Sequence, residues 1–521
     1  MDSLIPAALL LAIAAASVGL VVLMRVGIRV ALIWAAAAAA AMGIWVYYVS
    51  LASRLPLWTM WTVWQAIPGF EVEAPWLSID SFTWPVGAAF LTLTSVLILT
   101  SLSRLGDHGW RHLVWIFIFA ALGLFCVIAG TLPAVMIAWA ALDVITIIFL
   151  VKEVSAGDAM KQELPTLALN FLGIATLGFA LSAWGETPLD LAEIPAESAG
   201  IVLLAVGMRG AAVARRPMIG DPGGAGPGLG FLIIAVQAAA GISVLARAAA
   251  SGAGGITPFL LLLISAAVGL NSALRWLREG DRQARLPFWM GGMFSLAVAA
   301  AALELPGAVS AAGAVLLLCG GLVSAAGNGV MRYRWLVFLA AGLGSGVPFS
   351  PTWEIAGLVW GPPWFWTLVF SIVYSGLLAG LVLDNQESED RALSIVPGVR
   401  SVHTTGLILL AAGLVIAGWG AMLSSGRDPE NWWGGGLVIL FVYGWFRLKS
   451  VNTRVLPGFF RDRRIGLPYR WLHRPWRRGA TAAGFVLTIL ARLLEGEAAM
   501  LWALVLLSLI VSFFVQLGLG A

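Results

Sequence analysis

The sequence predicts an all-α polytopic integral membrane protein of about 14–17 transmembrane helices, and three observations point to this fold class. The 521 residues are 60% hydrophobic and only 11% charged, whereas soluble domains carry about 25% charged residues. The mean hydropathy is +0.93. Apolar stretches of roughly 20 residues, enough to cross a bilayer core as a helix, recur along the chain. Such a chain cannot cover its surface with polar groups, so its solvent is lipid.

The expected spans follow one another from the N-terminus almost to the C-terminus, with short polar loops between them. They lie near residues 4–24, 30–51, 82–103, 112–130, 133–151, 164–184, 200–214, 230–248, 256–274, 287–304, 307–327, 335–359, 364–383, 402–424, 432–446, 479–493 and 498–518.

The basic residues predict the orientation of these spans. Cytoplasmic loops of membrane proteins carry an excess of Lys and Arg, and here alternate loops are basic. Apart from Arg209, which lies inside a span, the basic residues on the other side are Arg54, Arg247, Arg427 and Arg492. We therefore expect a multi-pass protein of the cell (inner) membrane, with its N-terminus outside and its C-terminus in the cytoplasm.

The chain is expected to divide into three parts. Residues 1–80 form N-terminal transmembrane helices and an outer loop, 81–385 a transmembrane core, and 386–521 C-terminal helices with a basic cytoplasmic loop at 447–478. That loop either anchors the protein to anionic lipid or serves as a docking surface for a partner subunit. Basic residues placed beside spans are the membrane pattern, so no nucleic acid is expected as a partner.

Motifs of soluble enzymes are missing from the sequence. It contains no Gly-rich phosphate loop and no CxxC pair, and its two cysteines, Cys126 and Cys319, lie in apolar stretches. A metal or haem site between helices requires His or Cys side chains within the membrane. The four histidines lie in or near loops instead: His108, His112, His403 and His473. We expect no metal and no cofactor.

Charged residues inside the spans are the informative class, because they are costly in lipid and mark either ion paths or internal ion pairs. Asp143 lies mid-helix in WAALDVITIIF, and Arg209 lies in AVGMRGAAVARRP. Glu354 follows Pro348 and Pro351 in GVPFSPTWEIAG, where the prolines should break the helix. Broken helices are common at the ion sites of transporters. For each charge, a structural interhelical ion pair is the alternative.

Several motifs occur in the order of a known family. They are LSIDSFTWPVGAAFLTL, AWAALDVITIIF, WGETPLDLAEIPA, VGMRGAAVARRP, GISVLAR and GVPFSPTWE, spread over roughly residues 80–385. In these motifs the chain resembles the antiporter-like membrane subunits of respiratory complex I (NADH:quinone oxidoreductase) and of Mrp-type cation/proton antiporters, as a divergent member. The resemblance implies an inverted-repeat core with broken helices near 209–241 and 346–354, and other membrane subunits as partners.

The family carries protons through buried Glu, Lys and His residues, and this chain departs from that pattern. Ala140 follows Trp139 where the family has Glu, and Asp143 lies three residues further on nearly the same helix face. Arg209 stands where the family has Lys, and Gln237 is the only polar group in the next motif. Because Lys can release a buried proton and Arg cannot, most of the family's proton wire is missing.

Three hypotheses remain open. The first is an antiporter-like subunit of a multi-subunit complex that contributes to translocation of protons or monovalent cations, with Asp143, Arg209, Gln237 and Glu354 as ion-translocation candidates. It would be a non-redox subunit, and whether it belongs to an enzyme complex stays undecided. The second is a degenerate, non-pumping scaffold of the same fold that binds partner proteins. The third is an unrelated carrier or a membrane enzyme.

Overall fold

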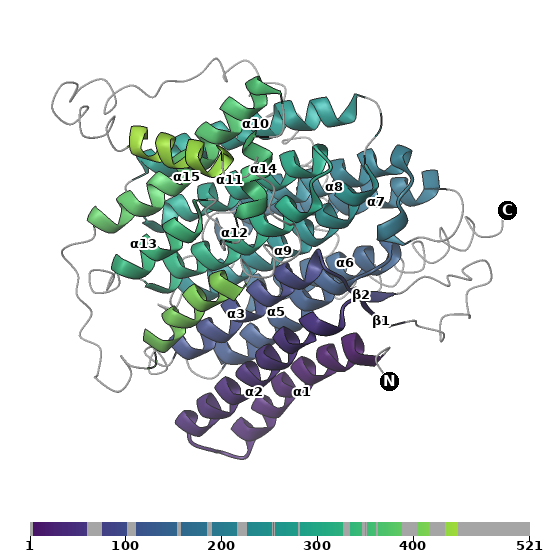
Figure 1. Ribbon diagram of the computed structural model, residues 1–521. Coiled ribbons are helices and arrows are strands. Elements are labelled where there is room, and N and C mark those ends of the chain that lie inside the picture. The colour runs from purple at the N-terminus through teal and green to yellow at the C-terminus, as the bar shows by residue number, and fades with distance from the viewer. Residues whose placement is uncertain are drawn as a thin grey trace. The chain divides into compact units, whose positions relative to one another are not determined.

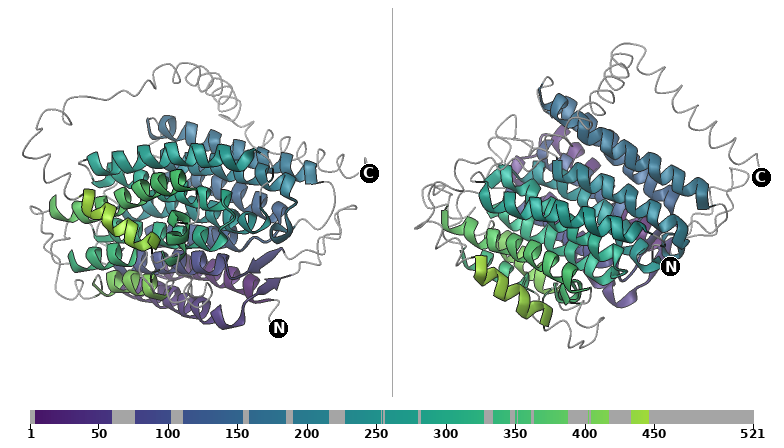
Figure 2. Two further views of the ribbon diagram at one scale, coloured as in Figure 1. Left: turned by 45° about the horizontal axis from the view of Figure 1, so that its top comes forward. Right: turned by 90° about the horizontal axis from the view of Figure 1, so that it is seen from above.

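Long apolar helices that run alongside one another make up the computed structural model (Figures 1 and 2). The described residues are 4–59, 76–101, 111–153, 158–184, 190–215, 227–252, 254, 256–279, 282–326, 334–345, 350, 352–360, 363–387, 402, 404–416 and 433–445. They belong to a single compact unit, and the second unit, 60–73 with 448–521, lies outside them.

Ten of the described helices are long and apolar enough to cross a membrane, and four shorter apolar helices accompany them. The helices are α1 (Ile5–Arg25), α2 (Val30–Ser50), α3 (Thr83–Ser101), α5 (Arg111–Ile128), α6 (Leu132–Glu153), α7 (Asp158–Trp184), α8 (Ala196–Arg215), α9 (Pro227–Ser251), α10 (Thr257–Arg278), α11 (Arg282–Ala302), α12 (Pro306–Ala326), α13 (Arg334–Leu343), α14 (Trp353–Trp360), α15 (Trp364–Glu387), Thr404–Ile416 and Trp433–Trp445.

The helices α9 and α12 form the centre of the bundle. The apolar windows of both are 100% buried, whereas those of α1 and α2 are only 17% buried. A helix that is hydrophobic on all sides is stable only when every side is covered by protein or lipid. The helix α9 contacts α3, α5, α8, α11 and α12, so protein covers it all round, and the outer faces of α1 and α2 are left for lipid.

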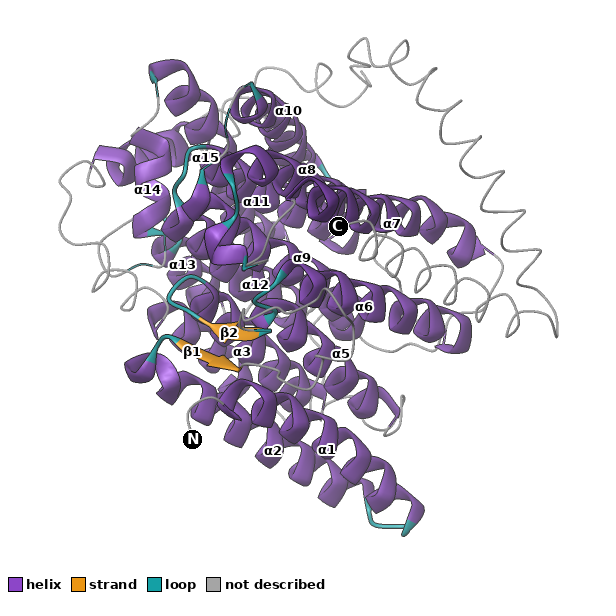
Figure 3. Ribbon diagram, turned by 90° about the vertical axis from the view of Figure 1, so that its right-hand side faces the viewer, coloured by secondary structure: helices purple, strands orange, loops and turns teal. Residues whose placement is uncertain are grey.

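A small antiparallel sheet of two strands accompanies the helices. Strands β1 (Leu57–Thr59) and β2 (Leu77–Ile79) are three residues long and pair next to the start of α3 (Figure 3). Leu77 also bridges to Ala129 in the turn between α5 and α6. The short 3-10 helices η2 (Leu51–Arg54) and η5 (Leu191–Glu193) lie in the connections.

The predicted fold class, a polytopic all-α membrane protein, is confirmed, and most expected spans match a helix to within a few residues. The expected span 335–359 is wrong as a single helix, because α13 ends at Leu343 and α14 begins at Trp353. The expected spans 479–493 and 498–518 and the basic loop 447–478 lie outside the described residues.

The interruption between α13 and α14 agrees with the break expected near 346–354. A broken helix inside a membrane must satisfy the backbone groups that it frees. Here the hydroxyl of Thr352 donates to the Leu343 carbonyl at 3.0 Å, and the hydroxyl of Tyr374 on α15 donates to the Gly344 carbonyl. Two backbone carbonyls that the end of α13 leaves free are therefore hydrogen-bonded by side chains of the protein.

The break expected near 209–241 is not found inside a helix. Both α8 and α9 run uninterrupted through Arg209 and Gln237, and the stretch 216–226 between the two helices is not described. The physical reason is local: neither described helix contains an interior proline, and Pro227 is the first residue of α9, where a proline is tolerated.

Glycines allow α11 to approach α8 and α9 closely. A Cβ atom on Gly210 would lie 2.0 Å from Cε1 of Phe294, and one on Gly241 would lie 2.9 Å from Cζ of the same ring. The Phe294 ring of α11 therefore occupies space that these two glycines leave open.

We predict that Gly210→Ala lowers the stability of the protein by about 1–3 kcal/mol, because overpacking a filled interior forces side chains off their rotamers. Gly207→Ala on the same helix is the matched control, since a Cβ there meets nothing within 4 Å. Thermal unfolding in detergent measures both. The packing explanation is wrong if the two variants have the same unfolding midpoint. It is also wrong if adding Phe294→Leu does not restore part of the stability lost in Gly210→Ala.

Candidate functional site

Polar side chains from four helices meet near the middle of the bundle. They are Asp143 on α6, Asn170 on α7, Arg209 on α8 and Gln237 on α9, with Trp139 of α6 beside them. We call these five residues the central cluster. Arg209 is 0% exposed, and the Asp143 side chain is 13% exposed. A charge at this depth is costly unless it is paired, so each member has to be explained by its neighbours.

The carboxylate of Asp143 is the acceptor on which the other polar groups converge. Arg209 binds it through both terminal nitrogens, Nη2 to Oδ1 at 3.0 Å and Nη1 to Oδ2 at 3.3 Å. Nδ2 of Asn170 donates to Oδ1 at 3.0 Å, and Nε2 of Gln237 donates to it at 3.3 Å. The Asn170 amide also donates to Oε1 of Gln237 at 2.7 Å. One ion pair and two amides therefore form a connected network.

The indole of Trp139 covers the other side of the charged pair. The guanidinium carbon of Arg209 lies 4.5 Å from the ring centroid of Trp139, within the range of a cation–π contact. The helix α7 comes close enough for Asn170 to join because Gly173, one turn on, carries no side chain. A Cβ there would lie 3.1 Å from the Ala205 carbonyl oxygen of α8.

Hydrogen bonding in the central cluster is incomplete within the described chain. Three buried polar atoms have no partner there: Nε of Arg209, Nε1 of Trp139 and Oδ1 of Asn170. Most buried polar atoms in proteins are paired, and each exception requires an explanation, which is often functional. The cluster thus offers two buried donors and one buried acceptor beside its carboxylate.

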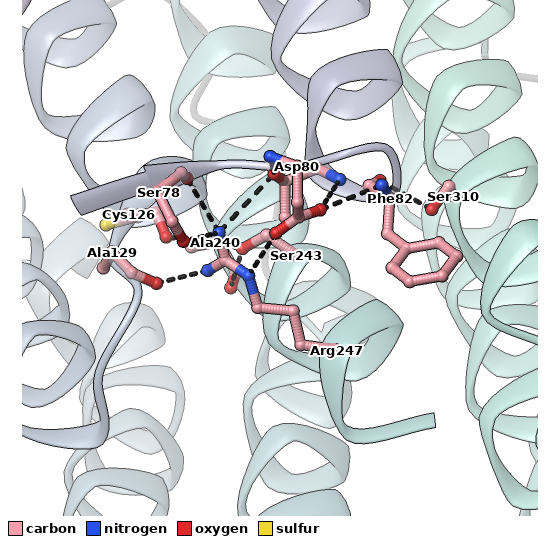
Figure 4. A network of polar contacts seen from close by, with 10 residues as sticks. Ser78, Asp80, Phe82, Cys126, Ala129, Ala240, Ser243, Arg247 and Ser310 are labelled. Carbon is pink, nitrogen blue, oxygen red and sulfur yellow. Dashed lines mark hydrogen bonds and ion pairs between the residues drawn. The ribbon is translucent and has the colours of Figure 1, made fainter. Parts of the chain in front are cut away.

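A second ion pair, between buried Arg247 and partly buried Asp80, lies at the far end of α9 and links several chain segments. Nε of Arg247 donates to Oδ2 of Asp80 at 2.8 Å, and its Nη2 donates to the carbonyl and the hydroxyl of Ser78 at 2.8 and 2.9 Å (Figure 4). Its Nη1 donates to the Ala129 carbonyl. We call Ser78, Asp80, Ala129 and Arg247 the outer cluster. It ties α9 to the β2 strand, to the start of α3 and to the turn after α5.

Asp80 has a second task at the start of α3. Its Oδ1 accepts hydrogen bonds from the backbone N–H groups of Phe82 and Thr83 at 2.9 and 2.8 Å, as an N-capping carboxylate does. Burial raises the pKa of the Asp80 carboxyl, but Arg247 and these backbone donors lower it by more, so the pKa lies below its ordinary value. The carboxylate is therefore ionised at neutral pH and belongs to a structural ion pair.

Solved structures with the same fold come from three membrane complexes. A chain in the structure of the Mrp complex from Dietzia sp. DQ12-45-1b aligns with a TM-score of 0.60 and 17% identity, over 98% of this chain and 63% of that chain. This chain thus spans less than two thirds of the Mrp chain. A chain of respiratory complex I from Thermus thermophilus aligns with a TM-score of 0.55 and 17% identity, over 78% of this chain and 97% of that chain.

The third structure is that of the membrane-bound sulfane sulfur reductase, an archaeal respiratory membrane complex. A chain in it aligns with a TM-score of 0.61 and 13% identity, over 97% of this chain and 99% of that chain. The chain has the antiporter-like subunit fold. Protein-family models and curated proteins give no match to the sequence, so the likeness is one of fold.

Within the antiporter-like fold, three of the four predicted candidates lie together. Asp143, Arg209 and Gln237 belong to the central cluster, and Asp143 contacts Arg209 although Ala140 stands where the family has Glu. Glu354 lies elsewhere: a Cβ on Gly307, in the first turn of α12, would lie 2.3 Å from its Oε2. Its part in translocation stays a prediction. The described residues hold no group of three or more His, Cys, Asp or Glu that could bind a metal.

Three members of these clusters were not predicted from the sequence: Trp139, Asn170 and Arg247. Asn170 carried a weak signal, a lone amide in the apolar run LALNFLGI, but its partners could not be read without the fold. Arg247 was counted only as a basic residue of the outer side, whereas the structure shows it in α9, 3% exposed and paired with Asp80. A basic residue next to a span end looks the same in sequence whether it faces water or a buried carboxylate.

We predict that Arg247→Ala destabilises the antiporter-like fold by about 1.5–3 kcal/mol, because it removes the charged hydrogen bonds to the partly buried Asp80 carboxylate. Arg54→Ala, at an exposed position at the end of η2, should change stability by less than about 0.5 kcal/mol. Thermal unfolding in detergent compares them. Equal midpoints would contradict a structural role for the outer cluster.

The lowered pKa of Asp80 also predicts a dependence on pH. Its stabilisation is fully present above the unfolded-state value of about 3.9 and is lost as the pH falls through the lower folded-state pKa. The unfolding midpoint of the wild type should therefore fall in acid by more than that of Asp80→Asn, which has no carboxylate to protonate. Parallel curves from pH 7 to pH 3 would refute this assignment.

Proposed function

We propose that the protein is an antiporter-like membrane subunit of a multi-subunit complex and contributes to translocation of protons or monovalent cations through Asp143. The observation that carries the proposal is the central cluster, in which a carboxylate, a guanidinium and two amides from four helices meet inside an apolar bundle. Intramembrane ionisable groups mark ion paths more often than other residues do. The unpartnered atoms of Asn170, Arg209 and Trp139 favour a site that exchanges its contacts.

The members of the central cluster have different roles in this proposal. Asp143 is the group that binds and releases the ion, because it is the only carboxylate of the cluster and the acceptor on which the other polar groups converge. Arg209 keeps its proton and serves as the fixed counter-charge. Asn170 and Gln237 are neutral, and their amides hold the carboxylate oxygen from two further helices, so that movement of any of these helices changes its surroundings.

A scaffold that no longer pumps is the second candidate, and one observation favours it. Arg209 engages both oxygens of the Asp143 carboxylate, and Arg cannot relay a proton as the family's Lys does. In this reading the pair holds α6 and α8 together, and the subunit binds partner proteins. The third alternative, an unrelated carrier or enzyme, loses support because chains with this fold occur in three membrane complexes.

Orientation and partners belong to the same proposal. The positive-inside pattern supports an N-terminus outside and a C-terminus in the cytoplasm. The parts 1–80, 81–385 and 386–521 remain the proposed organisation, with the core carrying the ion site. Partners would be other membrane subunits, and the redox chemistry of an NADH:quinone oxidoreductase-like complex, where present, would lie in those partners.

Asp143→Asn tests translocation directly. It removes the titrating group while keeping its shape, so we expect transport by the assembled complex to fall by at least tenfold, as for a buried charge that lines an ion path. The measurement is cation or proton movement in vesicles of the host membrane, energised by respiration or by an imposed cation gradient. Blue-native electrophoresis checks that the complex is intact.

Glu193→Gln is the control, because Glu193 is exposed in η5 and outside the central cluster. Normal transport in Asp143→Asn, with the complex assembled, would sink the translocation proposal and leave the scaffold. Loss of assembly in Asp143→Asn but not in Arg209→Lys would show instead that the charged pair is needed mainly to hold the helices.

A further inference from the structure

A line of buried polar side chains runs along one face of α7. Glu163, Thr166 and Asn170 are separated by three and four residues, which places them on the same side of a helix. They are 0%, 2% and 1% exposed. Such a line is unusual on a helix of this kind, because an apolar neighbour would cover the same space without the cost of burying polar groups.

This line connects one end of α7 to the central cluster. Asn170 is itself a member of the cluster and donates to both Asp143 and Gln237. Glu163 lies seven residues earlier, about 10 Å along the helix axis at 1.5 Å per residue, and five residues after the start of α7 at Asp158. It therefore lies near the end of α7 that faces the predicted cytoplasmic side.

The face of α7 changes character at the level of the cluster. One heptad beyond Asn170 on the same face lies Leu177, which is apolar and 0% exposed. The polar line thus leads to Asp143 from one direction only. Thr146 on α6, one turn from Asp143 toward the same end, is also fully buried, although its hydroxyl donates to the Leu142 carbonyl of its own helix.

We propose that this face of α7 is the access path to Asp143 and that Glu163 takes up a proton at its mouth. The inference rests on the proposed translocation function and names the ion. On this face of α7 the described side chains give one polar group per turn, Glu163, Thr166 and Asn170, whereas a dehydrated metal cation requires several oxygen ligands at once. The proton is held by the Glu163 carboxylate, moves along water molecules that hydrogen-bond to the Thr166 hydroxyl and to the unpaired Oδ1 of Asn170, and protonates the Asp143 carboxylate.

Cysteine labelling tests the path without any transport assay. Thr166→Cys and Leu177→Cys are made in the full chain within its complex and exposed to a charged, water-soluble methanethiosulfonate reagent. The wild type is the blank, because both of its cysteines are buried. We expect Thr166→Cys to react at least about tenfold faster than Leu177→Cys, since accessible thiols react and buried ones are inert. Equal rates, or faster reaction at Leu177→Cys, overturn the path.

Transport by Glu163 variants tests the carboxylate. Proton movement in Na⁺-free vesicles should fall at least tenfold in Glu163→Gln and recover in Glu163→Asp, while Glu279→Gln, at an exposed carboxylate just after α10, should leave it unchanged. Full activity of Glu163→Gln beside an inactive Asp143→Asn overturns this inference but leaves the translocation function standing. Full transport activity of Asp143→Asn refutes the proposed translocation through Asp143. The labelling result then still decides whether water reaches this face of α7.

Discussion

An unpaired charge cannot remain inside an apolar bundle, and this constraint organises the middle of the protein. Arg209 is permanently charged and 0% exposed, so a carboxylate has to meet it at the same depth. Asp143 does so from α6. Once the pair is fixed, α7 and α9 must present polar groups to the remaining lone pairs of the carboxylate, and Asn170 and Gln237 supply them. The buried charge of Arg209 thus requires matching polar residues at the same depth on α6, α7 and α9.

The helix α9 transmits this constraint to the membrane surface. It carries Gln237 in the central cluster and Arg247 in the outer cluster, ten residues or about 15 Å apart along the axis. Arg247 reaches Asp80, Ser78 and a backbone carbonyl at once, so it holds this end of α9 to three chain segments. A shift of α9 along its axis would therefore change the contacts of both clusters.

Features that depend on a single chain segment could be predicted from the sequence. Span lengths and their order follow from hydropathy alone, and the prolines on either side of Ser350 predicted the break between α13 and α14. Pairing across helices is different, because it depends on rotation and depth that no single segment encodes. Asp143 and Arg209 were marked as costly charges, but nothing in either segment indicated Asn170 as their neighbour. The ion pair of Arg247 was not predicted for the same reason, since its carboxylate partner, Asp80, is 167 residues away along the chain.

Arg209, at the position where the resemblance implies a Lys, also limits how protons could pass through this site. With Asp143 ionised, the pair is neutral; a proton on Asp143 leaves Arg209 as a buried uncompensated charge, a state that costs about 3–5 kcal/mol in comparable pairs. A Lys in that position could relieve the charge by losing its own proton, but Arg cannot. In the proposed function, proton uptake is therefore coupled to a movement of helices or to work done in another subunit. The proposed subunit, driven by its neighbours in a complex, meets this requirement, and a free-standing channel does not.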